Sequence, residues 1–105
     1  MVNDTANDQT VHGTAVLSLL ACNAAGKMIG PAWNATYLLG RTEVVDTEMQ
    51  VEEDYYVAGL EWGESQGAQI VSTSLGYSDW YSWQDVDGQT AVTTKAVNTA
   101  AELGI

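Results

Sequence analysis

Helix-forming and strand-forming segments alternate along this chain, and this alternation is the feature that most limits its possible folds. Residues 13–23 are almost entirely apolar and favour a buried helix, whereas residues 35–42 form a short run with β-strand composition. Residues 51–66 and 89–103 carry apolar side chains at helical spacing, and residues 68–74 again have strand composition. We therefore expect an α/β fold in which the two strands pair in a parallel sheet with helices on both faces.

The length of the chain fits a single domain, but the expected elements do not complete one. With 105 residues the chain can bury a modest core without help from metals or disulfides. Two strands make a poor sheet, however, and Ile105 follows directly after Gly104, the glycine that should end the last helix. A further strand of an α/β unit would begin there. We expect residues 1–105 to be one partial domain, the central part of a larger doubly wound fold.

Charge and composition exclude several classes of partner. The formal net charge of −11 repels phosphate backbones and anionic headgroups, so we expect no nucleic-acid partner. The longest apolar run, residues 15–22, is far shorter than the ~20 residues that a membrane-spanning helix needs. Cys22 is the only cysteine, which excludes an internal disulfide and a multi-cysteine zinc site, and we expect no cofactor. Unpaired strand edges and bare apolar surface should make the chain self-associate.

His12 is the only histidine, and it stands directly before the first apolar helix. Gly13 beside it lets the backbone or a substrate approach closely, and the helix would hold the imidazole rigidly at the edge of a cleft. A lone histidine without a visible partner identifies no site, however. On position alone, His12 is equally explained as the end of a loop.

Ser74, Leu75 and Gly76 follow the strand-like residues 69–72. In open α/β sheets, ligands bind beyond the carboxyl ends of the strands, so the main chain of these three residues could pair with an extended peptide. The simpler interpretation is an ordinary exit from a strand into a loop.

Taken together, these segments resemble the subtilisin-like serine proteases, the subtilases. The string His-Gly-Thr-x-Val at residues 12–16 matches the histidine motif of that family. Residues 30–39, from Gly-Pro-Ala to Tyr-Leu-Leu, look like its glycine-alanine turn and following strand. Residues 60–62 and 70–76 resemble the helix and the Ser-Leu-Gly strand beyond it. The stretches at 41–43 and 74–77 look like a bacterial branch of the family.

The resemblance implies a serine endopeptidase that acts on peptide or protein substrates in a secreted or cell-envelope location. His12 would be the general base that takes the proton from a serine nucleophile and returns it to the leaving amine. Ser74, Leu75 and Gly76 would line the substrate cleft and pair with the peptide. The family's Asp-Thr-Gly or Asp-Ser-Gly setting and its Gly-Thr-Ser motif do not occur in this sequence. We therefore expect a fragment that carries only the histidine of the Asp-His-Ser triad and is inactive alone.

A second hypothesis is a binding module: a small flavodoxin-like α/β domain whose acidic loops hold a cation or a basic partner. Asp79, Asp85 and Asp87 could ligate calcium, but the position that an EF-hand loop fills with a bidentate glutamate is Thr90. We therefore prefer to interpret these aspartates as part of a solvated acidic loop. Trp80, Tyr81 and Trp83 form either a cleft wall or an exposed patch.

The helix at residues 51–66 should bury one stripe, Val51, Tyr55, Ala58 and Trp62, and Gly67 should cap its carboxyl-terminal end. Acidic residues gather before it and in its first turn, where the helix dipole favours anions: Glu43, Asp46, Glu48, Glu52, Glu53 and Asp54. They could steer basic substrate side chains toward a cleft. The alternative is a solvated helix entrance.

Overall fold

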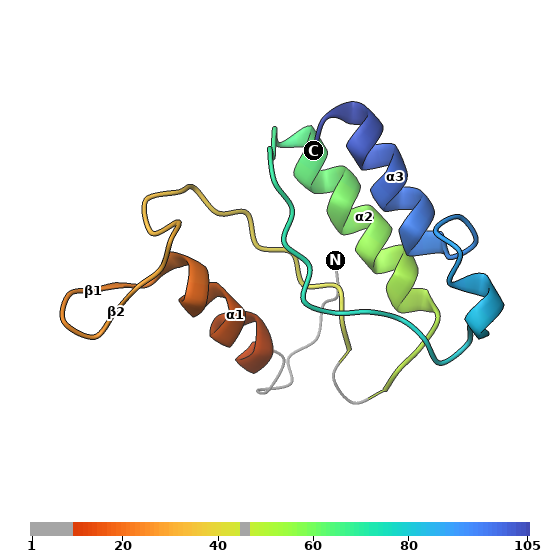
Figure 1. Cartoon of the computed structure of the whole chain (residues 1–105), viewed down its shortest axis with the longest axis horizontal. Coiled ribbons are helices and arrows are strands. Elements are labelled where there is room, and N and C mark those ends of the chain that lie inside the picture. Colours follow the sequence, from red (N-terminus) through yellow and green to blue (C-terminus); the bar gives the residue numbers. More distant parts are fainter. Residues whose placement is uncertain (1–9, 45–46) are drawn as a thin grey trace. The chain divides into compact units, whose positions relative to one another are not determined.

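The computed structural model describes residues 10–44 and 47–105 (Figure 1). The described chain forms two compact units, which divide between Leu38 and Leu39. Three α-helices and one two-stranded sheet make this a mixed α/β structure in the described ranges. No helix there combines the length and the apolar character needed to cross a membrane.

The first unit consists of one helix and one short hairpin. Helix α1 (Val11–Ala21) leads directly into strands β1 (Asn23–Ala24) and β2 (Met28–Ile29), which pair antiparallel. Gly26 has φ +77° in the connecting turn, a backbone conformation that residues with a Cβ atom rarely adopt. The string Gly-Lys-Met-Ile-Gly-Pro at residues 26–31 predicts a turn, and the structure has turns at both ends of it, but residues 28 and 29 between them form strand β2.

Gly30 closes the hairpin back onto the end of α1. Its backbone N–H donates to the carbonyl oxygen of Cys22 at 2.7 Å, and the N–H of Ala32 donates to that of Leu20 at 3.0 Å. A Cβ atom at Gly30 would overlap the carbonyl group of Leu20. Only glycine therefore allows this close approach of the two backbones.

Helix α1 is present as predicted, but it is not the buried helix that the sequence indicates. No residue of α1 is buried, and Val11 and Leu19 are 63% and 64% exposed. A helix that is apolar nearly all round needs cover on every side. Among the described residues of its own unit, only the short hairpin and the loop that follows it are available to cover the helix.

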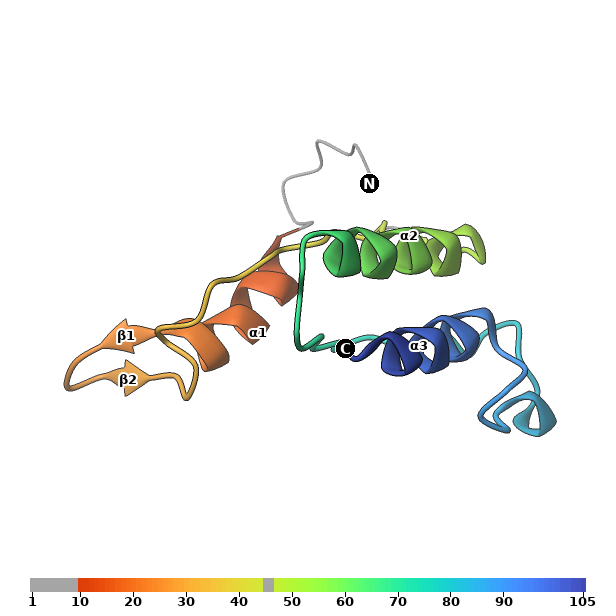
Figure 2. The same ribbon diagram turned by 90° about the horizontal axis from the view of Figure 1, so that it is seen from above.

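The second unit is built on two helices that lie side by side and run in the same direction (Figures 1 and 2). Helix α2 (Val51–Ser65) packs on α3 (Val92–Leu103), and a single turn of 3₁₀ helix, η1 (Trp83–Asp85), precedes α3. Tyr56, Leu60 and Ala100 form the core between the helices. The ends of α2 and α3 fall close to the predicted ones.

Glycines end both helices in the left-handed conformation, as predicted. Gly67 has φ +79° and Gly104 has φ +96°. After each of them the chain folds back on its helix: Ala68 donates to the carbonyl oxygen of Gly63 at 3.0 Å, and Ile105 to that of Ala100 at 3.1 Å.

The predicted parallel sheet is not seen. Neither residues 35–42 nor residues 68–74 contain a strand, and the sheet of the described chain is the antiparallel pair β1–β2. A β-leaning run becomes a strand only when a neighbouring chain satisfies its backbone groups, and neither segment pairs with one in the described ranges. The chain still returns from the end of α2 toward the start of α3 through residues 68–76 (Figure 1). That return is the path a strand takes between two parallel helices of an α/β unit.

Gly30→Ala should loosen the first unit, because the added methyl group must displace the backbone of Leu20. We expect a loss of about 1–3 kcal/mol, the usual effect of overpacking. Hydrogen exchange should be faster at the amides of positions 30 and 32. Gly40→Ala is the matched control, since a Cβ there meets no atom within 4 Å. Equal exchange rates in the two variants would contradict this role of Gly30.

Candidate functional site

His12 lies in the first turn of α1 and is exposed. The sequence predicts that His12 stands directly before the helix. The helix begins at Val11, however, so His12 lies inside it. The N–H of Thr14 donates to the carbonyl oxygen of Thr10 at 2.9 Å and fixes this first turn. The imidazole is thus carried on an ordered backbone and is open to a reacting partner.

Ser74, Leu75 and Gly76 belong to the second unit and form an irregular, exposed segment. Within the described part of the chain, no backbone–backbone hydrogen bond involves residues 69–76. The main-chain donors and acceptors of the predicted substrate-binding segment are therefore free to pair with another chain.

Glu52 is a buried carboxylate, with only 1% of its surface exposed. One of its oxygens accepts a hydrogen bond from the N–H of Val44 at 2.7 Å, and the other from the N–H of Met49 at 2.9 Å. The first turn of α2 thereby holds the loop that precedes it.

Glu53 is equally buried, and its carboxylate faces the aromatic loop. Its Oε2 accepts hydrogen bonds from Trp80 Nε1 at 3.1 Å and from the Tyr81 hydroxyl at 2.7 Å. Its Oε1 accepts one from the Thr93 hydroxyl at 3.3 Å. The Tyr81 oxygen in turn accepts from the N–H of Val92 at 3.1 Å. Glu53 thus joins α2 to the aromatic loop and to the start of α3.

The acidic residues before and within α2 are therefore not one solvated helix entrance. Glu48 and Asp54 are exposed and Glu43 is half-buried, but Glu52 and Glu53 are buried; Asp46 lies outside the described residues. The buried stripe of α2 is shifted by one position from the predicted one and consists of Glu52, Glu53, Tyr56, Leu60 and Gly63. The sequence contains a signal for this stripe: Glu52 and Glu53 precede Tyr56 by four and three residues, and Leu60 follows it by four, so all lie on one face of the helix.

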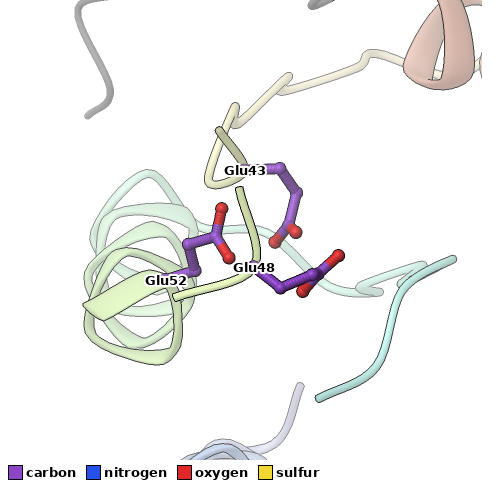
Figure 3. Close-up of side chains that lie close together, drawn as sticks. All are labelled: Glu43, Glu48 and Glu52. Carbon is purple, nitrogen blue, oxygen red and sulfur yellow. The ribbon is translucent and has the colours of Figure 1, made fainter. Parts of the chain in front are cut away.

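Figure 3 shows that Glu43, Glu48 and Glu52 direct their carboxylates toward one another. One oxygen from each lies within 4.8 Å of the others. Oxygen ligands of this kind suit a hard cation, but two of these carboxylates already accept hydrogen bonds from the protein: Glu52 from the loop and Glu43 from the Tyr77 hydroxyl. The Tyr77 hydroxyl also contacts the carbonyl oxygen of Glu52 at 3.3 Å.

Burial, together with the acidic surroundings, raises the pKa values of Glu43 and Tyr77. Burial raises the pKa of Glu43, and the negative charges of Glu52 and Glu48 add to that effect, while the hydrogen bond from Tyr77 opposes it. Burial also raises the pKa of Tyr77, and its hydrogen bond to the Glu43 carboxylate acts in the same direction. Both shifts favour the protonated forms.

Four aromatic side chains of this unit form a continuous row from Tyr56 to Tyr81. The rings of Tyr56 and Tyr77 meet edge to face at 6.4 Å, Tyr77 stacks on Trp80 at 5.9 Å, and Trp80 lies 6.3 Å from Tyr81. Trp83, by contrast, is 82% exposed. Glu53 thus holds Trp80 and Tyr81 in place. Of the three residues that the sequence suggests for a cleft wall or an exposed patch, only Trp83 is largely exposed.

Two of the three aspartates considered as calcium ligands, Asp85 and Asp87, have structural roles in their loop. Asp85 accepts hydrogen bonds from the N–H and the hydroxyl of Ser82, at 2.8 and 2.6 Å. Asp87 accepts from the backbone N–H groups of Gln89 and Thr90, both at 2.7 Å. The hydrogen bond from the Ser82 hydroxyl is the main cause of a lowered pKa at Asp85, and one from the Thr90 hydroxyl, at 2.8 Å, is the main cause at Asp87; the backbone N–H groups act in the same direction.

The family model of the Subtilase family matches residues 1–105, the whole length of the chain. This chain belongs to the subtilase family. No curated protein and no solved structure matches it. Subtilases are serine peptidases, so the family predicted from the residue motifs is confirmed, and with it a serine-peptidase type of function. The role of His12 and the bacterial branch remain predictions.

Glu53→Gln should destabilise this subtilase chain by about 1–3 kcal/mol. The new amide group places N–H donors against hydroxyl and indole groups that donate to the carboxylate. Urea unfolding monitored by tryptophan fluorescence measures the change. Asp54→Asn is the matched control, because it removes an exposed charge from the same turn. Equal unfolding midpoints for the two variants would contradict the role of Glu53.

Glu43 should make the stability of the subtilase chain depend on pH. Because its folded pKa is raised above 4.5, its contribution to stability is fully present below pH 4.5 and is lost as the pH rises through the folded pKa. Glu43→Gln should remove this decrease above pH 4.5, whereas Asp54→Asn should retain it. Unfolding free energies measured across this range test the prediction, and an unchanged slope in Glu43→Gln would refute it.

Proposed function

We propose that this subtilase chain is part of the catalytic domain of a serine endopeptidase and that His12 is its general base. The observation that carries the proposal is the family match over residues 1–105, together with the histidine motif of the family at residues 12–16. The exposed position of His12 on an ordered helix supports it.

In this role His12 moves one proton in each direction. Its imidazole takes the proton from the hydroxyl of the nucleophilic serine as the serine oxygen attacks the peptide carbonyl. It then gives that proton to the leaving amine as the peptide C–N bond breaks. An aspartate orients the ring and stabilises the imidazolium. Neither the aspartate setting nor the serine motif of the family occurs in residues 1–105, so other parts of the enzyme supply both.

Ser74, Leu75 and Gly76 are proposed to bind the substrate. Their exposure and their unpaired main chain support this role, because an extended peptide can add to such a segment as a further strand. The substrates are proteins or peptides, and the enzyme acts outside the cell or at the cell envelope, as is common in the family. Without the serine and the aspartate, the isolated chain hydrolyses no peptide bond.

The test uses the full-length enzyme, meaning the complete protein to which this chain belongs. His12→Ala should reduce kcat by several orders of magnitude, because the serine loses its base. Lys27→Ala is the control, since Lys27 is an exposed residue in the hairpin turn of the same unit. A His12→Ala enzyme that hydrolyses a peptide amide at the normal rate would refute the proposal. Turnover by residues 1–105 alone that disappears in His12→Ala would refute the separate claim that the isolated chain hydrolyses no peptide bond.

A further inference from the structure

The segment Ser74–Gly76 has no hydrogen bonds of its own, within the described residues, that would fix its conformation. Its three residues are exposed, and none of them makes a hydrogen bond within the described part of the chain. The residues immediately before and after it, Thr73 and Tyr77, are both attached to α2.

The attachment on the amino-terminal side is a pair of hydroxyl groups. The hydroxyl oxygens of Thr73 and Tyr56 lie 3.1 Å apart and share a hydrogen bond. Tyr56 is only 9% exposed and belongs to the core between α2 and α3. Thr73 is therefore tied to one of the most firmly packed side chains of this unit.

The attachment on the carboxyl-terminal side is the hydroxyl group of Tyr77. It donates to the Glu43 carboxylate and lies 3.3 Å from the carbonyl oxygen of Glu52, in the first turn of α2. The Tyr77 ring also meets the Tyr56 ring edge to face. The two attachments are thus in contact with each other as well as with the same helix.

We propose that Tyr56 and Tyr77 are positioning residues that hold Ser74–Gly76 in a fixed conformation for an extended peptide substrate. This inference rests on the proposed function, because it assigns a purpose to the segment only if the segment binds substrate. The tyrosines touch neither the substrate nor the reacting atoms. They act through the three residues between Thr73 and Tyr77.

The physical basis of the proposal is conformational entropy. Fixing the backbone of a free residue costs conformational entropy, so a loose segment of three residues would bind a peptide more weakly than one already ordered. Thr73 and Tyr77, directly before and after the segment, restrict its backbone when the enzyme folds. Less conformational entropy is then lost when the substrate binds. The effect should be confined to substrates long enough to lie along the segment.

The experiment compares two substrates of the full-length enzyme. One is a tetrapeptide amide, which extends along Ser74–Gly76, and the other is a single-amino-acid ester, which does not. Tyr56→Phe and Tyr77→Phe keep the aromatic rings and remove only the hydroxyl groups. Each should raise KM for the tetrapeptide about fivefold, the change produced by losing about 1 kcal/mol. KM for the ester and kcat for both substrates should stay the same.

Two further variants separate anchoring from general damage. Tyr55→Phe is the matched control, because Tyr55 lies on the same helix and its hydroxyl makes no contact with Thr73 or Tyr77. Thr73→Val should raise KM for the tetrapeptide as Tyr56→Phe does, and combining the two should give no further increase, since both remove one hydrogen bond.

The proposal is overturned if KM for the tetrapeptide is unchanged in both tyrosine variants. It is also overturned if kcat falls for both substrates alike, or if Tyr55→Phe produces the same rise in KM. Failure of the proposed function has a different signature, normal kcat in His12→Ala. The two failures are therefore distinguishable.

Discussion

The fold of residues 39–105 depends on two adjacent carboxylates, Glu52 and Glu53, that are almost completely removed from water. Burying an ionised carboxylate costs several kcal/mol unless hydrogen bonds replace its hydration. Here every hydrogen-bond donor comes from outside α2: from the loop before it, from the aromatic loop and from α3. The carboxylates can therefore be buried only when all these segments are in place.

This requirement connects the core to the candidate substrate-binding segment. The first turn of a helix favours anions, which makes it a suitable place for two buried acids. From there Glu53 fixes Trp80 and Tyr81, and the Glu52 backbone contacts Tyr77. The aromatic row that results runs from the core to the residue directly after Ser74–Gly76. Packing in the core and the conformation of an exposed segment are thus determined by the same interactions.

The elements that local signals specify were predictable from the sequence. Helical spacing predicts α2 and α3, and Gly67 and Gly104 end them as expected. The parallel sheet was predicted but is not seen. Strands depend on partners, and residues 35–42 and 68–74 meet none in the described chain. A uniformly apolar sequence likewise predicted burial for α1, but burial depends on what covers the helix.

The candidate site divides in the same way. The family could be identified from the short motifs around His12 and Ser74, whose roles stay predictions. The hydrogen bonds of buried Glu53 could not, because acidic residues are ordinarily exposed and its partners lie 27 to 40 residues away in sequence. The link between Tyr56 and Thr73 was equally hidden, since it joins positions 17 residues apart that no local pattern relates.

The most direct test of the central claim is a crystal structure of the full-length enzyme with a peptide inhibitor bound covalently to its nucleophilic serine. The account predicts that His12 lies within hydrogen-bonding distance of that serine, about 3 Å. It also predicts that the main chain of Ser74–Gly76 pairs with the inhibitor as an added strand. A different histidine beside the serine, or an inhibitor bound away from Ser74–Gly76, would contradict it.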